Sequence, residues 1–160
     1  MVNLNAVQTH TLGCIHASIA HSQAMVSTMA PAGFMDYRGI RDFCRIGFNL
    51  PQRAGSSVLS QYLIDDLSAK NPDAKILWLA NNFDFFGTHT EENPNVNVFQ
   101  MNDAAGYGRL ITLLGDSNVV YNYVIVDNAH YVCGRDIHFD KLAKVIFHQG
   151  ASQYIITFSS

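Results

Sequence analysis

Charged residues, cysteine and basic charge are all scarce in this chain, and each shortage excludes a class of protein. Charged residues make up 14% of the 160 residues against 48% hydrophobic, which is typical of a globular chain and not of a disordered one. The three cysteines, Cys14, Cys44 and Cys133, stand far apart, which argues against a disulfide framework or a compact zinc site. A formal net charge of −3 argues against general electrostatic attraction to nucleic acid.

Long uninterrupted hydrophobic runs are also missing. The most extended apolar segment near the start, residues 12–29, is interrupted by His16, His21, Ser22 and Gln23. It is too polar to cross a bilayer, and no positively charged segment precedes it as in a signal peptide. We therefore expect no membrane partner. The sparse, odd number of cysteines fits a reducing location, the cytoplasm of a cell or, for a viral protein, of its host.

The chain is expected to form a single α/β domain over residues 1–160, with an N-terminal helical extension at 1–35 and a core at 36–160. Apolar periodicity predicts helices over the first thirty residues and at 36–44, 56–70, 107–114 and 136–148. Short apolar runs predict strands at 46–50, 75–80, 96–101 and 153–158, and the most apolar run, 119–126, predicts another that includes 123–126. This alternation indicates a mainly parallel sheet sandwiched by helices, joined by right-handed crossovers.

Two of these helices show an apolar face in the sequence. In the first helix the apolar positions form a broken stripe of Val7, Leu12, Ile15, Ile19 and Met25. In the helix at 56–70 the predicted buried face consists of Val58, Leu59, Tyr62, Leu63 and Leu67.

A degenerate phosphate loop connects the strand at 46–50 to the helix at 56–70. A standard loop reads Gly-x-x-x-x-Gly-Lys-Ser/Thr, and here Gly55 and Ser57 match, whereas Leu50 replaces the first glycine and Ser56 the lysine. The residues expected to bind a phosphate are Gln52, Arg53, Ala54, Gly55, Ser56 and Ser57. Backbone N–H groups and the helix start hold phosphates in such loops, but Gly-Ser-Ser also fits a plain helix N-cap.

Polar residues follow two later strands at the edge where α/β sheets place ligands. The buried strand at 123–126 ends in Asp127 and Asn128. The last strand ends in hydroxyl residues, with Thr157, Ser159 and Ser160 near its end. An acid at Asp127 suits a magnesium ion, whereas the amide of Asn128 cannot act as a general base.

The order and spacing of these three segments resemble the ATPase core of phage terminase large subunits and, less closely, superfamily 2 helicases. The similarity covers residues 36–160, and residues 127–130 look like the helicase Asp-Glu-Ala-His box with one acid changed to an amide. It implies a P-loop NTPase fold, ATP and magnesium as cofactors, and Ser57 with Asp127 as the magnesium-holding pair. It also implies Asp127 and the degenerate Asn128 at the catalytic position, Thr157, Ser159 and Ser160 as a sensor or coupling motif, and Arg53 as a substitute for the lysine.

Three functions follow from this resemblance. The first is a hydrolysis-impaired domain of viral type that binds a nucleotide, a nucleic acid or a related motor protein as a regulatory module. The second is an active ATPase with a deviant loop, in DNA packaging or unwinding. The third is a structural or assembly protein that reuses the fold and forms a homo-oligomer through an apolar patch on residues 12–29.

One spatial expectation connects these hypotheses: the Gly55 turn and the Asp127 carboxylate should lie side by side on neighbouring parallel strands. Other readings have less support. His10, His16 and His21 are spaced six and five residues apart and do not share one helical face, which argues against a metal site. The aromatic residues Phe83, Phe85 and Phe86 either stack on bases or cover the sheet, and covering the sheet is favoured.

Overall fold

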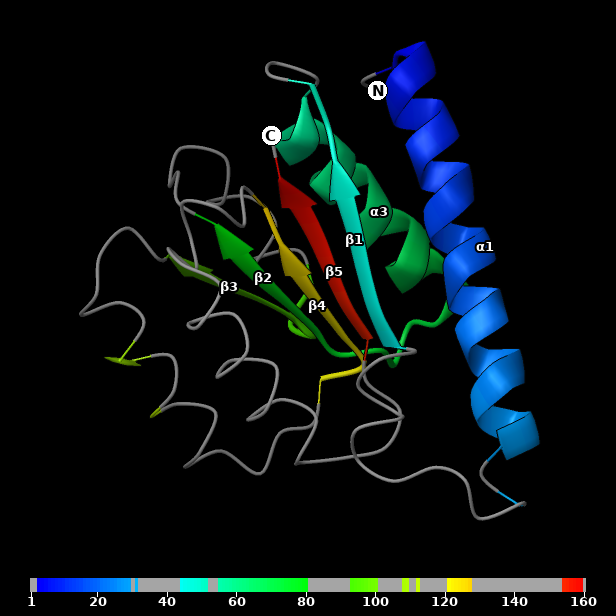
Figure 1. Cartoon of the computed structure of the whole chain (residues 1–160). Coiled ribbons are helices and arrows are strands. Elements are labelled where there is room, and N and C mark those ends of the chain that lie inside the picture. Colours follow the sequence, from blue (N-terminus) through cyan, green and yellow to red (C-terminus); the bar gives the residue numbers. More distant parts are fainter. Residues whose placement is uncertain are drawn as a thin grey trace.

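The computed structural model describes residues 3–29, 31, 44–51, 55–80, 93–100, 108–109, 112, 121–127 and 154–159. The main elements within these residues are helices α1 (Ala6–Met29) and α3 (Ser56–Lys70), with strands β1 (Arg45–Asn49), β2 (Ile76–Ala80), β3 (Val96–Gln100), β4 (Tyr123–Val126) and β5 (Tyr154–Ser159) (Figure 1). The expected helices at 36–44, 107–114 and 136–148 lie wholly or largely outside the described residues.

The described strands form one sheet in the order β1-β5-β4-β2-β3, and every pairing in it is parallel. The predicted α/β class with a parallel sheet is therefore confirmed. Because β1 and β2 are parallel and α3 connects them in sequence, α3 returns the chain to the edge where β1 began. All strands consequently end at the same rim of the sheet, toward which the arrowheads point in Figure 1.

Both faces of the central strands are buried. Leu77 and Trp78 are consecutive residues of β2, so the pleat directs their side chains to opposite faces, yet they are only 1% and 0% exposed. Ile155 and Ile156 of β5 show the same pattern, with neither side chain exposed. This continuous burial explains why these strands read as unbroken apolar runs instead of alternating apolar and polar residues.

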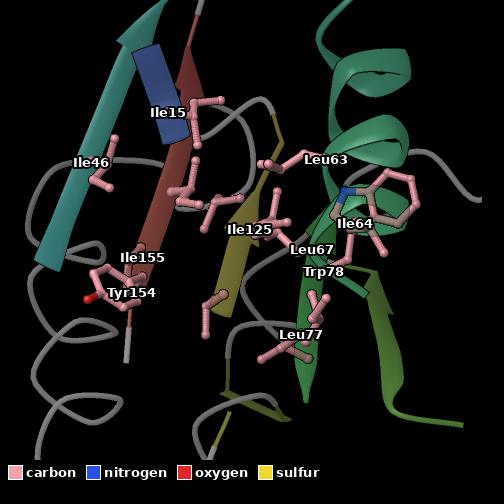
Figure 2. Packing of buried hydrophobic residues seen from close by; sticks show 14 of the residues in the cluster. Ile15, Ile46, Leu63, Ile64, Leu67, Leu77, Trp78, Ile125, Tyr154 and Ile155 are labelled. Carbon is pink, nitrogen blue, oxygen red and sulfur yellow. The ribbon is translucent and has the colours of Figure 1, made fainter. Parts of the chain in front are cut away.

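Helix α3 packs on one face of the sheet through a stripe of aliphatic side chains. The buried members of the stripe are Leu59, Leu63, Ile64 and Leu67. Figure 2 shows the side chains of Leu63, Ile64 and Leu67 gathered beside Ile125 and Trp78 of the sheet. The prediction that Tyr62 belongs to this face is wrong, because Tyr62 is 42% exposed. At 100° per residue, Tyr62 lies roughly 130° from the centre of the buried stripe.

Helix α1 lies alongside β1 and α3, with its N-terminal end near the rim where the strands end (Figure 1). Its buried residues recur every three or four positions at Gln8, Thr11, Ile15, Ile19 and Ser22. Val7 was expected in this stripe, but it is 45% exposed, because the polar residue Gln8 occupies the buried position instead. Farther along, His16 Nε2 contacts Asp66 Oδ2 of α3 at 2.5 Å, which ties the two helices together.

Candidate phosphate-binding site

The turn at Gly55 starts helix α3. Gly55 has φ 81° and ψ 45°, a left-handed conformation that glycine adopts at little cost. Its carbonyl oxygen accepts the first hydrogen bond of α3, from the backbone N–H of Leu59 at 3.0 Å. The N-cap residue of α3 is therefore Gly55, which has no side chain to form a capping hydrogen bond. The first-turn amides and the positive end of the helix dipole make such a start favourable for an anion.

Ser57 and Asp127 are joined directly at this helix start. Ser57 Oγ donates a hydrogen bond to Asp127 Oδ2 at 2.5 Å, across 70 residues of sequence. Asp127 follows β4, is only 2% exposed, and its backbone N–H donates to the carbonyl oxygen of Leu79 at 2.9 Å. A hydroxyl and a carboxylate are hard oxygen ligands that suit magnesium, and P-loop NTPases hold their metal with this pair of groups.

The expectation that the Gly55 turn and Asp127 lie on neighbouring strands is wrong in one respect. Strand β5 lies between β1 and β4, so two inter-strand spacings, roughly 10 Å, separate the strands that precede the two residues. They still meet, because α3 packs across the sheet and its first turn places Ser57 against Asp127. Both residues lie at the same rim of an all-parallel sheet, as the sequence predicted.

The remaining predicted site residues are distributed as follows. Gln52, Arg53, Ala54, Asn128 and Ser160 lie outside the described residues. Ser56 is the first residue of α3, and Ser159 is the last residue of β5, paired with Asn49 of β1. Thr157 lies inside the sheet, opposite Gly47 and Val126. A methyl group added to Gly47 would lie 3.1 Å from Thr157 Oγ1, so Thr157 packs closely against β1.

Sequence reasoning missed Gln8, which reaches the Gly55 turn from helix α1. Its side chain is 5% exposed, and Nε2 donates a hydrogen bond to the carbonyl oxygen of Gly55 at 3.0 Å. Asn5 and Gln8 also cap the start of α1, because the backbone N–H of each donates to the side chain of the other at 2.8 Å. The Asn-x-x-Gln spacing is a readable capping signal. The contact with Gly55, 47 residues away, has no local signal.

Groups with raised pKa values lie at the other end of the strands. Cys44 precedes β1, and burial raises the pKa of its thiol. Burial likewise raises the pKa of Tyr123, the first residue of β4. Burial raises the pKa of Tyr154 to about 12, with Cys44 and Tyr123 adding to the rise and a hydrogen bond with Gln23 opposing it. These groups stand at the starts of the strands and do not belong to the site beside Asp127.

Histidines do not assemble a metal centre in the part of the chain that the structure describes. No group of three or more His, Cys, Asp or Glu side chains is placed to hold a metal ion there. His16 is paired with Asp66, and His10 Nε2 lies 3.7 Å from Cys14 Sγ. Magnesium at Ser57 and Asp127 therefore stays a prediction from the sequence.

Few large hydrophobic side chains are exposed among the described residues. Among the described residues, the large hydrophobic side chains that are exposed are Val7 and Tyr62, and neither lies in the segment 12–29 proposed as an assembly patch. Of the helices described, none combines the length and apolar character needed to cross a membrane.

The sequence matches no protein-family model and no curated protein. The all-parallel α/β class therefore comes from the structure itself. The functional conclusion depends on the geometry at Gly55, Ser57 and Asp127.

Proposed function

We propose that this chain is a P-loop-type domain that binds the phosphate groups of a nucleotide together with magnesium at the start of α3, and that its hydrolytic chemistry is impaired. In this role it acts as a binding or regulatory module related to viral DNA-packaging ATPases, with a nucleic acid or a motor protein as its partner. The observation that carries the proposal is the 2.5 Å hydrogen bond between Ser57 Oγ and Asp127 Oδ2.

The binding role divides among groups at the rim. The left-handed Gly55 turn leads directly into the first turn of α3, whose backbone amides face outward from the helix start and favour an anion. Ser57 and Asp127 would hold the magnesium ion, which supplies positive charge that offsets phosphate charge. Magnesium keeps several waters and takes few protein ligands, so two oxygens from the chain are sufficient.

The impaired chemistry follows from two positions in the sequence. Ser56 stands where the loop lysine would neutralise phosphate charge, and Asn128 stands where a second acid would activate water. A primary amide cannot take a proton from water at neutral pH, so Asn128 removes the general base. Binding is retained in this proposal because Asp127 and Ser57 are present and joined.

Isothermal titration calorimetry with ATP and ADP, with and without magnesium, tests the binding role. We expect Ser57→Ala and Asp127→Asn to weaken magnesium-dependent binding by about tenfold or more, which corresponds to about 1.4 kcal/mol. Ser57→Thr is the matched control, because it keeps a hydroxyl at the same position and should stay close to the wild type. No heat and no thermal shift at millimolar nucleotide, from a chain with native circular dichroism, would refute the proposal.

A phosphate-release assay tests the impairment separately. We expect no turnover above background, with or without DNA, because the second acid is replaced by Asn128. Turnover that Asp127→Ala abolishes would instead establish the active ATPase with a deviant loop, and it would overturn only the impaired part of the proposal.

A further inference from the structure

The carboxamide of Gln8 is held at both of its ends. Its oxygen Oε1 accepts a hydrogen bond from the backbone N–H of Asn5 at 2.8 Å. Its nitrogen Nε2 donates to the carbonyl oxygen of Gly55 at 3.0 Å. The backbone N–H of Asn5 can only donate and the Gly55 carbonyl can only accept, so the orientation of the amide is determined and Nε2 must face Gly55. The cap of α1 therefore aims a hydrogen-bond donor at the turn that begins α3.

The Gly55 carbonyl is the point where this donor acts. It accepts bonds from Gln8 Nε2 and from the Leu59 N–H, each at 3.0 Å. The two bonds fix the orientation of the peptide group that follows Gly55, two residues before Ser57. The turn is closely packed, since a methyl group added to Gly55 would lie 2.4 Å from Gln8 Nε2. The conformation of the turn and the position of Gln8 are thus coupled.

Helix α1 has other anchors that do not depend on Gln8. His16 contacts Asp66 of α3 at 2.5 Å, and Gln23 hydrogen-bonds Tyr154 at the start of β5. Ile15 and Ile19 of α1 are also buried in the hydrophobic core. A change at Gln8 can therefore release the Gly55 turn while the rest of α1 stays in place.

From these contacts we infer that Gln8 is a positioning residue, through which helix α1 holds the Gly55 turn in the conformation that binds phosphate. This inference rests on the proposed function, because its consequence is a change in nucleotide affinity. When only a fraction of molecules has the competent loop, the apparent dissociation constant rises by the inverse of that fraction. Removing the Gln8 donor costs the net free energy of one hydrogen bond, so we expect nucleotide affinity to fall roughly five- to tenfold.

Gln8→Glu is the sharpest test variant. Glutamate at this position keeps the capping bond from the Asn5 N–H and suits the first turn of a helix, so α1 should retain its stability. It replaces the donor with a carboxylate oxygen facing the Gly55 carbonyl. We expect Mg·ATP to bind about five- to tenfold more weakly by calorimetry at about pH 7.5. We also expect faster amide hydrogen exchange at residues 57–59, while exchange at the Asp66 end of α3 is unchanged.

Lowering the pH should restore the Mg·ATP affinity that Gln8→Glu loses. A protonated glutamic acid can donate to the Gly55 carbonyl while its other oxygen still accepts from Asn5, and this bond favours the neutral form and raises the pKa of the variant carboxyl. The affinity deficit of Gln8→Glu relative to the wild type should therefore shrink as the pH falls to about 4.5. The wild type, measured over the same range, corrects for protonation of the nucleotide.

A control variant separates positioning of the Gly55 turn from general damage to helix α1. His16→Ala removes an anchor of α1 far from Gly55 and should change Mg·ATP affinity by less than about twofold. If Gln8→Glu binds like the wild type while Ser57→Ala does not, the positioning role is refuted and the proposed function stands. If the wild type binds no nucleotide, both proposals fail.

Discussion

Gly55→Ala is the substitution for which the structure makes the most demanding prediction. The residue has φ 81°, a conformation that an alanine adopts only at a cost. A methyl group there would also lie 2.4 Å from Gln8 Nε2, far inside van der Waals contact. Because Gln8 is held by Asn5 and by the Gly55 carbonyl, it can move away only by losing those hydrogen bonds.

The expected size of the effect follows from these contributions. Left-handed backbone costs about 1–2 kcal/mol for an alanine. Displacing Gln8 removes at least one hydrogen bond that contributes about 1 kcal/mol. Alanine also restricts the unfolded chain, which offsets about 0.4–1 kcal/mol of the loss. The free energy of unfolding should therefore fall by about 2 kcal/mol.

Urea unfolding of four proteins measures this: the wild type, Gly55→Ala, Gln8→Ala and the double variant. With Gln8 shortened to alanine, the methyl group no longer meets a side chain, and only the backbone cost of Gly55→Ala remains. The penalty for Gly55→Ala should then fall by about 1 kcal/mol. In the double-mutant cycle formed by the four proteins, this difference is a coupling energy of that size between Gln8 and Gly55.

Two results would refute this reasoning. A loss below about 0.5 kcal/mol for Gly55→Ala would mean that the turn does not require a left-handed residue. Additivity within about 0.3 kcal/mol would mean that Gln8 and Gly55 do not interact in solution. A parallel calorimetric titration with Mg·ATP shows whether the same variant also lowers nucleotide affinity.

Other predictions concern the core and the far rim. Leu63→Ala should lower the free energy of unfolding by about 2–5 kcal/mol, whereas Tyr62→Ala, at an exposed site on the same helix, should cost less than about 1 kcal/mol by urea unfolding. The pKa of Tyr154 is raised to about 12, so its contribution to the free energy of unfolding is full below about pH 10. This contribution is lost as the pH rises from there toward 12, at up to about 1.4 kcal/mol per pH unit. An unchanged urea midpoint from pH 9.5 to 11.5 would contradict this. In a Cys133→Ser background, a thiol reagent should label the partly exposed Cys14 at once and the buried Cys44 only on unfolding; equal rates would contradict its burial.

The local elements were predictable because their signals are local. The apolar spacing within 56–70 predicts a helix of the bounds that α3 has. The apolar run at 119–126 predicts a buried strand, and β4 forms over its last four residues. The sequence also placed Gly55, Ser57 and Asp127 at one rim, because parallel strands joined by crossovers end on the same edge. Val7 and Tyr62 each stand one position before a buried residue, Gln8 and Leu63, and one position along a helix turns the side chain by 100°.

Tertiary structure alone decided how those pieces meet. The sequence alone was enough to predict the described helices and strands, the class of sheet and the residue types available at the rim. It did not reveal that β5 lies between β1 and β4, that Ser57 reaches Asp127 across that strand, or that Gln8 holds Gly55. These contacts join residues 47 and 70 positions apart, and they depend on how α1 and α3 pack across the sheet. Periodicity reports which face of an element is buried, but it carries no information about which distant element covers that face.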